Sequence, residues 1–130
     1  MQKKSRDNLS FVHGRILISA ATKAFSGGTA HIFLEDISRA DAPRRVVAKI
    51  EINNIEHPLK DSGNSATGIS FRIDFLDEAY NPKNYYSLRV WIDLNGDEKQ
   101  SADDLYNDRV YPVLTRGAGN FAEIPLKSQD

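Results

Sequence analysis

YYSLRVWIDLNGDEKQSADDLYNDRVYPVLT, residues 85–115, is the stretch of this sequence that decides its fold. Its first nine residues alternate strictly, and a period of two is typical of a β-strand with one buried face. We therefore expect a strand over 85–93. The inward face of this strand would carry Tyr86, Leu88, Val90 and Ile92. The outward face would carry Tyr85, Ser87, Arg89 and Trp91.

The second half of this stretch predicts another strand, over residues 108–115, after a loop that is rich in carboxylates. Pro112 lies inside that strand and has no backbone N–H to give to a sheet. The strand should therefore lie at a sheet edge or contain a bulge.

Alternating segments also occur on both sides of this stretch. They predict strands over residues 11–20, 29–36, 45–55, 68–75 and 121–126, with a turn at Ser26-Gly27-Gly28 between the first two. The inward residues of the first three would be Val12, Gly14, Ile16 and Ile18, then Ala30, Ile32 and Leu34, then Val46, Ala48, Ile50 and Ile52. No segment has a convincing helical period, and short strands separated by turn signals favour an antiparallel arrangement. The sequence therefore predicts an all-β protein, an antiparallel β-sandwich of about seven strands. We expect one domain over 11–126, after a disordered leader (1–10) and before a short tail (127–130).

The composition excludes several classes of function. A net charge of −1 gives no general reason to expect a nucleic-acid partner. The chain has no cysteine for a disulfide or a thiolate metal site, and it has no apolar run long enough to span a membrane. G-x-S-x-G and H-E-x-x-H motifs do not occur, and His13, His31 and His57 lack metal spacing. We expect a soluble protein that is not an enzyme.

The acidic loop allows two interpretations. In an EF-hand-like reading, Asp93, Asn95 and Asp97 fall at positions 1, 3 and 5, the Lys99 carbonyl at 7 and Asp104 at 12. Glu98 occupies the position where calcium loops have glycine, so any calcium would be bound weakly and would serve to order the loop. The alternative is an ordinary polar hairpin turn, for which Asn-Gly is a strong signal.

The outward face of residues 85–93 is the second candidate site. Tyr85, Arg89 and Trp91 would form an aromatic stripe with one cation, and such residues supply much of the energy of protein interfaces. A peptide or a sugar could bind there, and Tyr111 could extend the stripe. The alternative is that a neighbouring loop covers Trp91.

Four short motifs resemble the YbaY-like and YscW-like lipoprotein family, over about residues 11–126. They are Leu34-Glu35-Asp36, Ala40-Asp41-Ala42-Pro43, Asn84-Tyr85-Tyr86-Ser87 and Tyr111-Pro112-Val113-Leu114-Thr115-Arg116-Gly117. The family includes pilotins, the lipoprotein chaperones of type III secretion systems. The resemblance implies a small β-sandwich and, in the pilotin branch, a chaperone that binds a secretin subunit and is carried to the outer membrane by a lipid. This chain differs from that branch because it has no cysteine to lipidate.

We therefore expect a non-enzymatic binding or assembly module with a protein partner. If a signal sequence has been removed, the resemblance implies a location in the bacterial cell envelope. The alternative function is a calcium-stabilised accessory domain or a carbohydrate-binding β domain.

Overall fold

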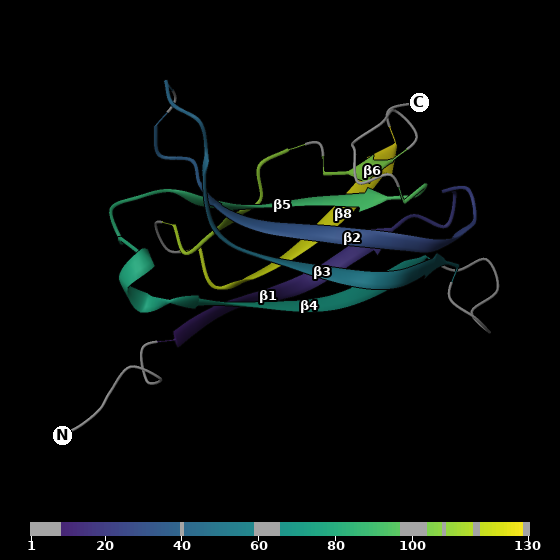
Figure 1. Ribbon diagram of the computed structural model, residues 1–130, viewed down its shortest axis with the longest axis horizontal. Helices are drawn as coiled ribbons and strands as arrows, with labels where there is room; N and C mark the ends of the chain where they lie inside the picture. Colours follow the sequence, from purple (N-terminus) through teal and green to yellow (C-terminus); the bar gives the residue numbers. More distant parts are fainter. Residues whose placement is uncertain are drawn as a thin grey trace.

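The computed structural model describes residues 9–39, 41–58, 66–96, 104–107, 109–115 and 118–128, which form one rolled β-sheet (Figure 1). The strands are β1 (Leu9–Ile18), β2 (Phe25–Asp36), β3 (Arg45–His57), β4 (Thr67–Leu76), β5 (Tyr86–Asp93), β6 (Leu105–Tyr106), β7 (Pro112–Val113) and β8 (Phe121–Ser128). A single turn of 3-10 helix, η2 (Asp77–Ala79), follows β4.

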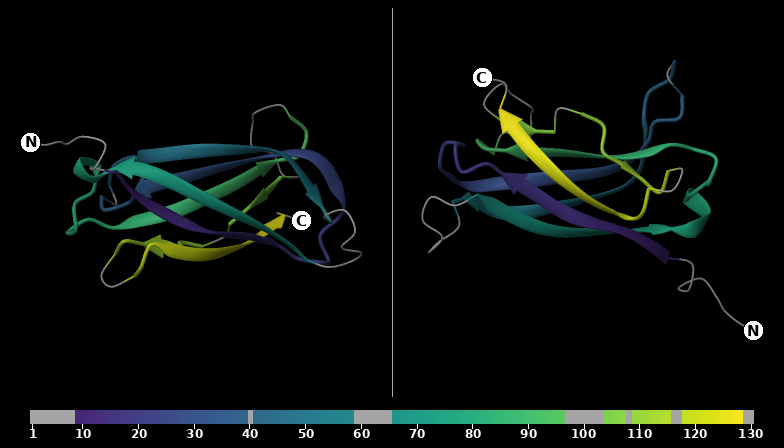
Figure 2. Two further views of the ribbon diagram at one scale, coloured as in Figure 1. Left: turned by 90° about the horizontal axis from the view of Figure 1, so that it is seen from below. Right: turned by 180° about the vertical axis from the view of Figure 1, so that it is seen from behind.

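The strand order is β3-β2-β5-β6-β8-β1-β4, and β7 pairs separately with β5. All neighbours are antiparallel except β1 and β8, which run parallel. The sheet curls until its two end strands, β3 and β4, face each other, as the views in Figure 2 show. Side chains link these two strands at one end, where the ring of His57 contacts Thr67 Oγ1 at 2.7 Å. At the other end, Arg45 donates to the carbonyl of Ala79 at 3.4 Å.

The predicted all-β class is confirmed, and the two sides of the predicted sandwich belong to one continuous sheet. The inward residues predicted for 85–93 are all buried, and those of 11–20 and 29–36 are buried as well. They meet Phe71, Ile73 and Phe75 of β4 in the core. Alternation identified the inward residues of all three strands, but only β1 and β2 keep a partly exposed outer face, since Arg89 alone among the eight residues of β5 is not buried.

β3 follows the predicted alternation less well, because it is an end strand. Val46 is 46% exposed, although it was expected on the inward face with Ala48, Ile50 and Ile52. The other three are only half-buried.

Two local predictions were wrong. Ser26-Gly27-Gly28 was expected to be a turn, but it lies inside β2, where the register with β3 shifts between Phe25 and Gly28. Gly27 has φ +74°, so the glycine serves an irregular, bulged strand rather than a turn between strands. The expected strand over 108–115 is reduced to Pro112–Val113, and Leu105–Tyr106 pairs with β5 instead. Asp108 itself lies outside the described residues.

The parallel pair of β1 and β8 is tight at Gly14, which lies opposite Ala122 in the register. A Cβ atom on Gly14 would stand 2.0 Å from the carbonyl oxygen of Ala122 and 3.0 Å from the Phe71 ring. Only glycine therefore fits where the first strand of the chain meets the last.

Among the residues that the structure describes, no helix is long and apolar enough to cross a membrane.

Candidate partner-binding groove

The ladder of β5 is interrupted in its middle. Its first residues, Tyr86 and Ser87, pair with β7, and Trp91 and Ile92, near its end, pair with β6. The three residues between them, 88–90, have no strand partner on that side of β5 in the described chain. The chain between β6 and β7 leaves the sheet at this point.

Asn107 fills the gap in the ladder with its side chain. Its Oδ1 accepts from the backbone N–H of Val90 at 2.8 Å, and its Nδ2 donates to the carbonyl of Leu88 at 3.3 Å and of Arg109 at 2.9 Å. The N–H of Leu88 donates to the carbonyl of Tyr111 at 3.1 Å. The side-chain amide of Asn107 thus replaces a backbone peptide group in the ladder, because like a peptide it has both a donor and an acceptor.

This arrangement pushes Arg109 and Val110 out from the sheet. Val110 is 52% exposed, whereas the backbone on both sides of it is fixed to β5. Ser87 of β5 fixes the end of the segment that follows Val110, because its Oγ accepts from the N–H of Tyr111 at 3.1 Å and donates to the carbonyl of Tyr111 at 3.4 Å. Arg109 and Val110 therefore form a firmly held wall that protrudes beside β5.

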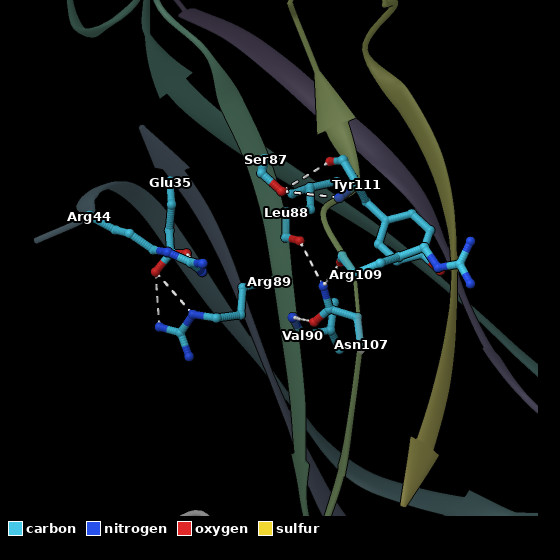
Figure 3. A network of polar contacts seen from close by, with 9 residues as sticks. All are labelled: Glu35, Arg44, Ser87, Leu88, Arg89, Val90, Asn107, Arg109 and Tyr111. Carbon is cyan, nitrogen blue, oxygen red and sulfur yellow. Dashed lines mark hydrogen bonds and ion pairs between the residues drawn. The ribbon is translucent and has the colours of Figure 1, made fainter. Parts of the chain in front are cut away.

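An ion cluster lies on the other side of β5 (Figure 3). Glu35 of β2 is buried, and its Oε2 accepts from Nε and Nη2 of Arg89, each at 3.0 Å. Its Oε1 contacts Nη1 of Arg44 at 3.4 Å. The guanidinium of Arg89 also lies over the Phe33 ring, 4.1 Å from its centroid. Two cations thus share one carboxylate.

Between the ion cluster and the protruding wall lies a groove of about 270 Å³ on the outer face of β5. It is lined by Ile37, Arg44, Ser87, Leu88, Arg89, Asn107, Arg109 and Val110. Three of these residues are arginines and none is acidic. The groove therefore combines positive charge with exposed aliphatic surface.

The structure separates the three residues of the predicted stripe. Arg89 lines the groove, and Tyr85 is exposed just before β5 begins. Trp91 lies on the predicted outward face but is only 7% exposed, so the expected exposed stripe is interrupted there. Tyr111 follows Val110 in the protruding segment and is half-buried.

Two neighbours cover Trp91. Its ring stacks on His31 with 4.4 Å between centroids, and its Nε1 donates to Oδ2 of Asp104 at 2.8 Å. A sugar platform needs an exposed ring face, so this geometry gives the carbohydrate-binding alternative no support. Trp91 contributes to the fold of this face rather than to its open surface.

The described part of the acidic loop uses its carboxylates for backbone hydrogen bonds. Oδ1 of Asp93 accepts from the N–H of Asn95 at 3.2 Å and of Gly96 at 3.0 Å, which is an Asx-type turn. Oδ1 of Asp104 accepts from the N–H of Leu94 at 3.0 Å. Asp97 and Lys99, two further predicted calcium ligands, lie outside the described residues. Calcium binding therefore stays a prediction.

The calcium prediction can be tested by thermal unfolding. A bound ion stabilises the native state in proportion to the logarithm of its saturation. We expect a melting temperature several degrees higher in millimolar calcium than in EDTA, and no such rise in Asp93→Asn. Asp74→Asn, at an exposed position on β4, is the control. Equal melting temperatures for the parent protein in both buffers would reduce the loop to an ordinary hairpin turn.

The loop after β2 forms the third side of the groove, and Asp36 anchors it. Its Oδ1 accepts from the N–H of Ser38 at 3.0 Å and its Oδ2 from Nδ2 of Asn84 at 2.8 Å. Burial alone would raise the pKa of Asp36, but hydrogen bonds from Ser38, Asn84 and Arg45 outweigh it and hold the pKa below its usual value.

The lowered pKa of Asp36 predicts that the folded protein loses stability at acid pH. Because the folded pKa is lowered, Asp36 stabilises the native state above its unfolded pKa of about 3.9, and this contribution is lost as pH falls through the folded pKa. We expect Asp36→Asn to lose stability against urea at neutral pH but to differ little from the parent at the acid end of the titration. If the gap between the two proteins stays constant over that range, the lowered pKa does not contribute to stability.

Most of the residues that line the groove were not identified from the sequence. Glu35 and Arg44 looked like ordinary polar positions, and Asn107 and Val110 looked like parts of a loop and of a strand. The one available signal was Glu35, an acid next to the buried Leu34 and on the same outward face as His31 and Phe33.

Comparisons with known proteins support the fold. No family model and no curated protein matches the sequence. The structure is similar to a solved structure described as an alternative pilotin from the type II secretion system of Vibrio cholerae. The TM-score is 0.70 at 19% sequence identity, over 91% of this chain and 95% of that chain. The chain therefore has a pilotin-like fold, as the resemblance implied, whereas the YbaY-like and YscW-like assignment stays a prediction.

Proposed function

We propose that this chain is a non-enzymatic assembly module of a bacterial secretion apparatus that binds a protein partner in the groove on β5. The observation that carries the proposal is the wall built by Asn107, which holds Val110 and Arg109 out beside the Glu35, Arg44 and Arg89 cluster. The pilotin-like fold supports the type of role. The partner that the family resemblance implies is a secretin subunit.

The groove is well suited to binding because its walls are already held in place. Association costs less free energy when the binding surface need not be ordered first. Here the backbone of Asn107 and of Tyr111 is hydrogen-bonded to β5, and the loop after β2 is held by the N–H of Ile37, which donates to the carbonyl of Tyr85 at 2.9 Å. A partner would therefore meet a rigid surface.

The polar groups of the groove favour binding over catalysis. Ser87 Oγ is the groove's hydroxyl, and it is engaged on both sides by the backbone of Tyr111. A serine nucleophile needs a base within hydrogen-bond reach, and the described partners of this hydroxyl are backbone groups. Its role is to hold the wall.

The proposal can be tested by co-purification with the secretin subunit encoded in the same genome. We expect the parent protein to retain the subunit and Val110→Asp to lose it, because the substitution removes the aliphatic contact at the centre of the groove and adds a charge that must be desolvated on binding. Val46→Asp is a matched control, since Val46 is 46% and Val110 52% exposed and Val46 lies on β3. Equal retention by both variants would contradict the proposed site.

A further inference from the structure

We infer that the groove on β5 recognises an acidic peptide segment, with a carboxylate held by Arg44, next to the pair of Arg89 and Glu35, and an aliphatic side chain packed against Val110. This inference rests on the proposed function and specifies the chemistry of the partner.

The charge of the cluster is unbalanced. Glu35 carries one negative charge, whereas Arg44 and Arg89 together carry two positive charges. Glu35 is buried, so its negative charge is balanced by the two arginines that contact it and is not available to a ligand. A second carboxylate entering the groove would be attracted by the remaining positive charge.

The two arginines differ in how firmly they are held. Arg89 makes two 3.0 Å contacts with Glu35 and stacks on Phe33, and its side chain is 33% exposed. Arg44 makes one contact of 3.4 Å, and its side chain is 56% exposed at the edge of the groove. A guanidinium has five N–H donors in a planar fork that fits a carboxylate. Arg44 is therefore the residue that can turn toward a ligand, while Arg89 keeps Glu35 neutralised.

The aliphatic part of the groove selects for a peptide. Val110 projects from the wall, and Ile37 lines the groove from the loop after β2. In an extended peptide the residues at i and i+2 point to the same side, so an acidic and an aliphatic side chain in that spacing could reach the cluster and the wall together. A bare phosphate would use the arginines and leave this aliphatic surface exposed.

The experiment is a selection of random peptides displayed on phage against the immobilised protein. We expect the enriched peptides to carry Asp or Glu near an aliphatic residue. One enriched peptide, synthesised with a fluorescent label, is then titrated by anisotropy. Arg44→Glu should bind it at least about tenfold more weakly, which is about 1.4 kcal/mol. Arg72→Glu is the matched control, because Arg72 is also an exposed arginine with one acidic partner, Asp74.

Glu35→Gln provides a test that loss of folding cannot imitate. The amide keeps the shape of Glu35 but no longer neutralises the arginines, so the acidic peptide should bind several-fold more tightly. Weaker or unchanged binding would overturn the inference.

The remaining outcomes separate the inference from the proposed function. Peptides without acidic bias that still depend on Val110 would overturn the inference and leave the proposed function standing. Displacement of the peptide by inorganic phosphate at equal concentration would identify a general anion site and overturn the inference. If Val110→Asp retains the secretin as well as the parent protein does, the groove on β5 is not the binding site.

Discussion

Gly14→Ala is expected to destabilise the protein by at least about 3 kcal/mol and to leave much of it unfolded in the cell. The new methyl group would stand 2.0 Å from the carbonyl oxygen of Ala122 and would also press on Phe71. The oxygen belongs to the backbone of β8, so relief requires β8 to move away from β1. Chemical denaturation with urea, followed by Trp91 fluorescence, measures the loss.

Gly68→Ala is the matched control. Gly68 is also a strand glycine, in β4, but the nearest atom to its new Cβ would be a guanidinium nitrogen of Arg15 at 2.5 Å. The side chain of Arg15 is half-exposed and can swing away. A cost well below that of Gly14→Ala is expected. Similar losses in both variants would mean that backbone entropy, and not the contact with Ala122, decides the effect.

Arg89→Met is expected to destabilise the protein by about 2 to 4 kcal/mol, because it leaves the buried carboxylate of Glu35 with one long contact to Arg44. Methionine retains most of the aliphatic volume and can still pack on Phe33. The loss therefore measures the uncompensated charge rather than a cavity. Urea unfolding at low and high salt gives the value.

The double variant Arg89→Met with Glu35→Gln tests the cause. Once the charge of Glu35 is removed, most of the stability lost in Arg89→Met should return, since a buried ion pair can often be replaced at little cost whereas half of one cannot. If the two substitutions add independently, Glu35 and Arg89 are not coupled and the ion cluster does not hold this face.

The core strands could be predicted from the sequence because alternation reports burial directly. Leu88 and Ile32 alternate with polar or aromatic residues and are fully buried. The prediction failed where backbone pairing is broken, since a pattern of side chains does not show which N–H groups find partners. Asn107 replaces a strand residue with its own amide, and no periodicity reveals that. The expected strand over 108–115 was wrong for this reason.

The candidate site was harder to predict because it depends on contacts across the sheet. Arg89 was identified from its outward position, but its partner Glu35 lies 54 residues earlier in the sequence. Trp91 is on the predicted face, yet a histidine of β2 and the aspartate at the end of the acidic loop cover it. An outward position predicts the face of a side chain, whereas its exposure depends on residues that only the fold brings near.

The pairing of β1 with β8 has a consequence for how the protein is made. Arg15 and Glu123 lie across this pair and are 108 residues apart in the sequence. Contacts of such long sequence separation close late, because the entropy of the intervening chain must be lost before they form. A ribosome releases β1 long before β8 is synthesised. During this time β1 can pair with β4, but the edge of β1 that will pair with β8 has no partner strand. The fold can be completed only after β8 has left the ribosome, and until then the open edge of β1 is exposed to wrong pairing.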